Sequence, residues 1–140
     1  MDKQVKWVEE NYKEKVLSYR SVRPAPEFEL EDLSGGWVRL SDQKGNVILL
    51  CFWASWSKSS QLLLKELEHL ADAYDQKVLF LTITTDVNIS SARRFVRKED
   101  IPFSVLVNDG TDQKYGVQGV PTLFVIDKNG NINFEHKGYN

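Results

Sequence analysis

Residues 47–60 read VILLCFWASWSKSS, and this stretch decides the fold of the chain. Its first six residues are all apolar, which is typical of a parallel strand that is buried on both faces. A leucine-rich pattern with helical spacing follows from Leu62 to Leu70. We therefore expect a strand, a turn and a helix, with the unpaired N–H groups and the positive dipole end of the helix directed into the turn.

Two serines stand where such a turn could carry reactive thiols. A thiolate is the anion that enzymes most often place at a helix N-terminus, and a partly exposed thiol at position 57 could form a disulfide with one at position 60. The residues are Ser57 and Ser60 instead. A serine hydroxyl needs a general base to act near neutral pH, and no His or Asp lies within the motif. As written, the turn carries no catalytic residue.

The frame around these serines resembles the thioredoxins, specifically the TlpA/ResA-like branch, which is related to the AhpC/TSA redoxins. That branch has Phe-Trp-Ala-Ser/Thr-Trp-Cys-x-x-Cys after a hydrophobic strand, and here Ser57-Lys58-Ser59-Ser60 replaces the cysteine pair. Ala25-Pro26-Glu27-Phe28 and Leu40-Ser41-Asp42 also resemble the branch. The resemblance implies an α/β thioredoxin-like fold. Its central mixed sheet is flanked by helices and carries an N-terminal hairpin and a strand–helix insertion.

Apolar periodicity and turn signals divide the rest of the chain. We expect an N-terminal amphipathic helix within residues 1–22, from about Asp2 to Tyr19, and a thioredoxin-like domain at 23–140. Ser90 or Ser91 should cap a helix. No last helix is expected after Gly138, so either the chain was trimmed or the N-terminal helix covers that face. The expected strands are Val47–Phe52, Val78–Thr84, Val105–Val107, Leu123–Ile126 and an edge strand at Ile132–Glu135.

Gly119-Val120-Pro121-Thr122 is a second motif of the thioredoxin family. In thioredoxins the corresponding X-Pro bond is cis and lies against the thiol turn. The resemblance implies that the backbone of Val120 is free to pair with an extended peptide. It also implies that Trp53 is buried and Trp56 partly exposed. The predicted peptide-binding residues are therefore Trp56, Ser57, Lys58, Val120 and Pro121, with the alternative that Pro121 only shapes the fold.

Composition excludes several other classes of function. The net charge of −2 gives no reason to expect a nucleic-acid partner, and no apolar stretch is long enough to span a bilayer. Cys51 is the only cysteine, on a buried strand, and we expect it to be inert. His69 and His136 do not have metal-ligand spacing, and no cofactor is expected. Arg93, Arg94, Arg97 and Lys98 form a basic helical patch, which we interpret as a solvated face partly offset by Glu99 and Asp100.

Two hypotheses for the function remain open. The first is a redox-inactive module that binds a protein or extended peptide through Trp56, the Ser57–Ser60 turn and the Val120–Pro121 loop. The second is a cell-envelope thiol–disulfide oxidoreductase in a Cys-to-Ser inactive form. Ser59 favours natural divergence, because engineering would leave the intervening residues alone. A peroxiredoxin relative would need a cysteine near the start of the helix. The resemblance implies a periplasmic or envelope address, although the N-terminus has no signal-peptide pattern.

Overall fold

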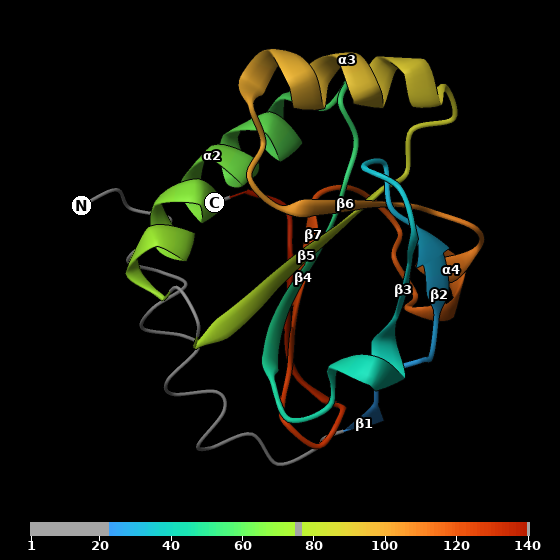
Figure 1. Cartoon of the computed structure of the whole chain (residues 1–140), viewed down its shortest axis with the longest axis vertical. Coiled ribbons are helices and arrows are strands. Elements are labelled where there is room, and N and C mark those ends of the chain that lie inside the picture. The colour runs from blue at the N-terminus through green and yellow to red at the C-terminus, as the bar shows by residue number, and fades with distance from the viewer. Residues whose placement is uncertain (1–22, 75–76, 140) are drawn as a thin grey trace.

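Strand β4 (Val47–Trp53) lies inside a six-stranded sheet in the computed structural model, which describes residues 23–74 and 77–139. The strand order is β1-β8-β7-β4-β5-β6 (Figure 1). β5 and β6 run parallel to β4, whereas β7 is antiparallel to it, so the sheet is mixed as predicted. The other strands are β1 (Arg23–Pro24), β5 (Val78–Thr84), β6 (Ser104–Val107), β7 (Thr122–Ile126) and β8 (Asn131–Lys137).

Two helices, α2 (Lys58–Ala73) and α3 (Ile89–Glu99), pack on one face of the sheet. Side chains alternate between the faces of a strand, so every second residue of β4 points toward these helices. The apolar stripe of α2 meets them there, and burial of each such side chain stabilises the fold by roughly 1.5–3 kcal/mol. This half of the core contains Leu49, Cys51 and Trp53 of β4 and Leu63, Leu64, Leu67 and Leu70 of α2.

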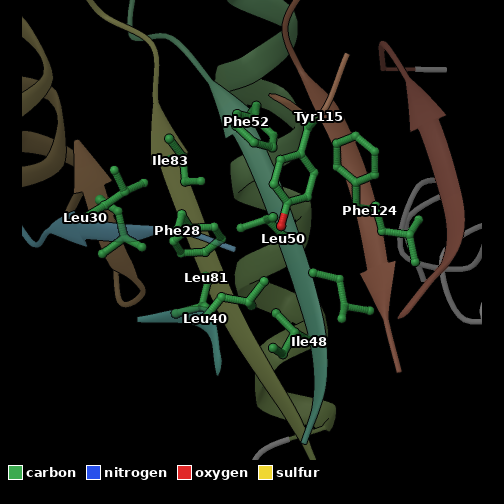
Figure 2. Close-up of a cluster of buried hydrophobic side chains, with 13 residues drawn as sticks. Phe28, Leu30, Leu40, Ile48, Leu50, Phe52, Leu81, Ile83, Tyr115 and Phe124 are labelled. Atoms are coloured by element: carbon green, nitrogen blue, oxygen red, sulfur yellow. The ribbon is translucent and has the colours of Figure 1, made fainter. Parts of the chain in front are cut away.

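The opposite face is covered by a hairpin and a tyrosine. The hairpin consists of β2 (Glu29–Glu31) and β3 (Trp37–Arg39), followed by the 3₁₀ turn η1 (Leu40–Gln43). Tyr115, just after the short helix α4 (Thr111–Lys114), packs its ring on Phe52 and Phe124 at centroid distances of 5.4 and 5.3 Å. Its hydroxyl donates a hydrogen bond to the carbonyl oxygen of Pro26 at 2.7 Å. Figure 2 shows these rings with the apolar side chains of the hairpin segment against β4 and β5.

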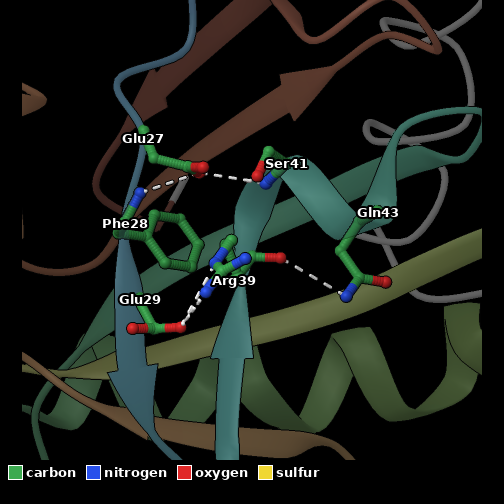
Figure 3. A network of polar contacts seen from close by, with 6 residues as sticks. All are labelled: Glu27, Phe28, Glu29, Arg39, Ser41 and Gln43. Carbon is green, nitrogen blue, oxygen red and sulfur yellow. Dashed lines mark hydrogen bonds and ion pairs between the residues drawn. The ribbon is translucent and has the colours of Figure 1, made fainter.

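A small polar network ties the hairpin to the chain on either side of it (Figure 3). The Glu27 carboxylate accepts hydrogen bonds from the backbone N–H groups of Phe28 and Ser41 at 3.1 and 2.9 Å. Arg39 pairs with Glu29 across the two strands at 2.8 Å. Partial burial alone would raise the pKa of Glu27, but the hydrogen bonds from Ser41 and Phe28 and the charge of Arg39 outweigh burial and lower it.

The sequence-based prediction was wrong at two element boundaries. Helix α3 is capped by Asn88, whose side-chain oxygen accepts from the N–H of Ser90 at 3.0 Å, and not by Ser90 or Ser91. The strand expected at Ile132–Glu135 extends over Asn131–Lys137 and is not an edge strand, because Arg23 and Pro24 pair with Ile132 and Asn131. The helix expected at Asp2–Tyr19, and with it the proposed division at residue 22, lies outside the described residues.

Candidate functional site

The turn between β4 and α2 is held by hydrogen bonds that the side-chain oxygens of Ser57 and Ser60 accept. The Ser57 Oγ caps α2, because it accepts from the N–H of Ser60 at 3.1 Å. The N–H of Ser57 in turn donates to the carbonyl oxygen of Ala54 at 3.1 Å. Only 8% of Ser57 is exposed, so this position is less accessible than the partly exposed site that the sequence suggested. The Ser57 hydroxyl acts here as a helix cap.

Ser60 is fully buried in the first turn of α2. Its Oγ accepts a hydrogen bond from the N–H of Ala54 at 3.2 Å. The two serines thus lie one helical turn apart and both satisfy backbone N–H groups of the same turn. The N–H of Ser60 is one of the donors that a helix start leaves unpaired, whereas the N–H of Ala54 lies just after β4. The two serine hydroxyls therefore hold this turn in place without supplying a group that ionises near neutral pH.

Asp86 supports the turn from a neighbouring loop, and the sequence analysis missed it. Its carboxylate accepts from the backbone N–H of Ser55 at 2.8 Å, from the Ser55 hydroxyl at 2.5 Å and from the Thr84 hydroxyl at 2.5 Å. The parallel pairing of Trp53 with Thr84 brings the loop after β5 beside the loop after β4. The carboxyl ends of parallel strands meet at one edge of a sheet, and this general rule could have indicated from the sequence that Asp86 lies beside the turn. Asp86 bonds to Ser55, so its hydrogen bonds position the turn.

Apolar side chains stand exposed around this buried framework. Trp53 is fully buried, and its ring packs against Phe95 at a centroid distance of 5.5 Å. Trp56, three residues later, is 74% exposed, and Val87, next to Asp86, is fully exposed. Large exposed apolar side chains that gather at one edge of a sheet are typical of an interaction surface. Lys58, at the start of α2, is also exposed.

The loop before β7 lies at the same edge as the turn. Phe52 pairs with Thr122, so Pro121 and Val120 precede β7 where Trp53 and Ala54 follow β4. The Val120–Pro121 peptide bond is cis. The N–H of Gly138 donates to the Pro121 carbonyl at 2.8 Å. Within residues 23–74 and 77–139, no backbone hydrogen bond engages Val120, which is half-buried. Its N–H and C=O are therefore available to an added strand.

Cys51 lies in the middle of β4 and is 1% exposed. Burial disfavours the charged thiolate and raises the pKa of Cys51 to about 12. This thiol is therefore protonated and shielded at neutral pH. Among the described residues, no three His, Cys, Asp or Glu side chains are placed to hold a metal ion. None of the helices in that same part of the chain is both long and apolar enough to cross a bilayer.

Comparison with known proteins shows that this chain is similar to thiol–disulfide oxidoreductases with a thioredoxin-like fold. The model of the AhpC/TSA family matches residues 22–135, which include the turn and the Val120–Pro121 loop. Thiol-disulfide oxidoreductase ResA of Bacillus thuringiensis subsp. konkukian is 33% identical over 119 residues, 83% of this chain and 69% of that protein. Thioredoxin-like protein YneN of Bacillus subtilis is 29% identical over 133 residues, 92% and 78% of the two chains.

The solved structures similar to this chain share its fold. A candidate thiol:disulfide interchange protein DsbE from Chlorobium tepidum has a TM-score of 0.81 at 30% identity, and the match covers 88% of this chain and 89% of that one. The exposed lipoprotein thioredoxin Etrx1 of Streptococcus pneumoniae has a TM-score of 0.74 at 29% identity, with 82% and 91% covered. These matches confirm the thioredoxin-like fold that the motif predicted.

Proposed function

This chain belongs to the AhpC/TSA family and has the thioredoxin-like fold of its TlpA/ResA-like members, and from that premise we propose that it is a redox-inactive module that binds extended peptide segments of a protein partner. The observation that carries the proposal is the turn itself. Ser57 and Ser60 keep the arrangement of a thioredoxin-like turn, while the only thiol of the chain, Cys51, is buried in β4.

Redox inactivity follows from the chemistry of exchange. Thiol–disulfide exchange begins with attack by an accessible thiolate. Cys51 is neither ionised at neutral pH nor accessible, and a serine oxygen cannot form the mixed disulfide. We expect no turnover in an insulin-reduction assay above the rate of the reductant alone. A rate that falls in the Cys51→Ala variant would show that the proposal is wrong.

Peptide binding is supported by two accessible features in the loops at this end of the sheet. The unpaired backbone of Val120 offers hydrogen bonds to an added strand, and the exposed ring of Trp56 offers apolar contact. Binding by strand addition obtains affinity from such main-chain bonds and selectivity from the neighbouring pockets. Neither feature requires a cysteine. The loops that carry the predicted binding residues follow β4 and precede β7 at one edge of the sheet, which supports a common binding surface.

A tethering experiment tests this surface. The Ser57→Cys variant is equilibrated with short peptides whose cysteine is supplied as its disulfide with 2-mercaptoethanol. The thiolate introduced at position 57 attacks that disulfide and releases 2-mercaptoethanol, added 2-mercaptoethanol drives the reverse exchange, and mass spectrometry measures the fraction held as a mixed disulfide. A peptide that contacts the surface should resist displacement better than N-acetylcysteine amide. Trp56→Ala and Pro121→Ala together, in the same background, should remove the advantage. The wild-type protein is the control, because its only thiol is buried. An advantage that survives both substitutions would exclude this surface.

A second candidate is an envelope oxidoreductase in a Cys-to-Ser form. Two observations favour it. The hydrogen bond from the Ser60 N–H to the Ser57 Oγ shows that positions 57 and 60 lie close together, one helical turn apart, and the relatives include ResA. An envelope address would fit a relative that is an exposed lipoprotein. Ser57→Cys with Ser60→Cys should then form an internal disulfide and reduce insulin. A restored pair that never oxidises would exclude this candidate.

A further inference from the structure

A shallow cavity of about 220 Å³ opens beside the turn, between Ser55 and one face of α3. The residues from α3 recur at helical spacing and therefore share one face of that helix. Ser55 lies directly before the exposed Trp56, so the cavity adjoins the proposed peptide surface. The residues that line it are Ser55, Ser91, Arg94, Phe95 and Lys98.

The cavity carries uncompensated positive charge. Arg94 and Lys98 are exposed, and neither forms an ion pair or hydrogen bond with another residue in the described part of the chain. Glu99, the carboxylate that the sequence suggested as an offset, is paired with Lys65 of α2 at 3.7 Å. Asp86 lies near Ser55 but is buried and does not line the cavity. An anionic group could therefore enter without meeting a like charge on the lining residues.

The remaining lining residues suit a carboxylate on a short apolar stem. The ring of Phe95 is half-buried and packed on Trp53, which gives the cavity a rigid apolar side. Ser91 lies in the first turn of α3, at the positive end of the helix dipole. Arginine presents a planar set of donors that matches a carboxylate. The cavity therefore combines an apolar wall with hydrogen-bond donors and positive charge.

We propose that this cavity receives a glutamate or aspartate side chain of the partner, so that the peptide bound at the turn is acidic. The inference rests on the proposed peptide-binding function and specifies its partner class. The peptide backbone would pair at Val120 on one side of the turn. Its carboxylate would lie between Arg94 and Lys98 on the other side, with Trp56 between the two contacts.

The test compares two peptides on the Ser57→Cys variant. Each has a central cysteine, supplied as its disulfide with 2-mercaptoethanol and flanked on both sides by glutamates in one peptide and by glutamines in the other. The readout is the 2-mercaptoethanol concentration that displaces half of the peptide. Two solvent-exposed charge contacts should raise that concentration roughly fivefold for the glutamate peptide at low salt. The preference should decline as salt is added, because the contacts are exposed.

Matched substitutions assign the preference to the cavity. Arg94→Gln with Lys98→Gln should abolish it, whereas Arg97→Gln removes one positive charge from the same helix outside the cavity and should retain most of it. Thermal melts check that each variant is folded. Equal retention of the two peptides, or a preference that survives the double substitution, would overturn the acidic-partner inference alone. Failure of both peptides to exceed N-acetylcysteine amide would overturn peptide binding itself.

Discussion

At the scale of single residues, Ser57 acts as the N-terminal cap of α2 at a position where the family motif has a thiol. The oxygen of Ser57 accepts from the N–H of Ser60, which is an unpaired donor at the start of α2. An ionised thiol there would be stabilised by the same N–H group and the same helix dipole. The N–H group and helix dipole that would stabilise a reactive thiolate therefore also suit a neutral serine cap.

Ser57→Ala should lower the free energy of unfolding by about 1 kcal/mol, because it removes a helix cap. Ser59→Ala is the matched control: Ser59 is exposed in the same turn and makes no side-chain hydrogen bond with a described residue, so its effect should stay within about 0.5 kcal/mol. Chemical denaturation measures both. Equal losses for the two variants would contradict the capping role of Ser57.

At the scale of elements, the candidate site is assembled by strand pairing. The parallel register of β4 and β5 brings Asp86 under the turn, and the antiparallel register of β4 and β7 brings Pro121 to the same edge. Each contributes from a loop at a strand end, and neither is close to the turn in sequence. The site is therefore as rigid as the sheet that positions its loops.

Asp86→Ala should destabilise the protein by about 2 kcal/mol, because the Ser55 N–H and hydroxyl would lose their acceptor in a largely buried place. It should also weaken peptide tethering, since the backbone before Trp56 would no longer be fixed. Asp109→Ala, at an exposed turn, is the control and should change little. Loss of stability with unchanged tethering would show that Asp86 does not position the binding surface.

The hairpin should respond to pH through Glu27. Because the pKa of Glu27 is lowered in the folded protein, its charge contributes stability above the unfolded pKa, and this contribution disappears as pH falls through the folded pKa. Glu27→Gln should therefore be less stable than wild type near neutral pH, by at most about 0.5 kcal/mol for so exposed a group. The difference should vanish in acid.

The sequence predicted the central elements better than the contacts between them. Val78–Thr84 was predicted to the residue, because an apolar run bounded by turn residues has few alternatives. The cap of α3 was misassigned because Asn88, Ser90 and Ser91 are all good caps, and only local geometry selects among them. Asp86 was placed in a loop without a role, because its partner Ser55 is 31 residues away and only strand register brings the two together.

At the scale of the whole molecule, the sheet separates two cores that different elements cover. Helices α2 and α3 close one face, and the hairpin with Tyr115 closes the other. Family resemblance predicted a mixed sheet flanked by helices with an N-terminal hairpin, but it did not predict that the hairpin and Tyr115 cover a face of the sheet. Periodicity alone did not specify which element covers which face, because the hairpin and the helices are all amphipathic. Cys51 is buried in the core on the helix side, so ionisation of its thiol requires that this core opens.

Stability should decline in alkaline solution because of Cys51. Burial raises its pKa to about 12 in the folded protein, so the thiol stabilises the fold below the unfolded pKa near 9, and that stability is lost as pH rises toward 12. The loss should approach about 1.4 kcal/mol per pH unit in that interval. Cys51→Ala should flatten this part of the profile. A profile of unchanged slope would indicate that the thiol is accessible in the folded state.

The oxygen atoms at the Ser57–Ser60 turn have a consequence for where the protein can work. A turn closed by a disulfide has two covalent forms, and its surface depends on the reduction potential of the surrounding compartment. Here the same turn is held by hydrogen bonds that the Ser57 and Ser60 side-chain oxygens accept from backbone N–H groups, and such bonds respond to no oxidant or reductant in the normal cellular range. On the proposed redox-inactive function, the molecule presents one constitutive face to its surroundings, whatever their potential.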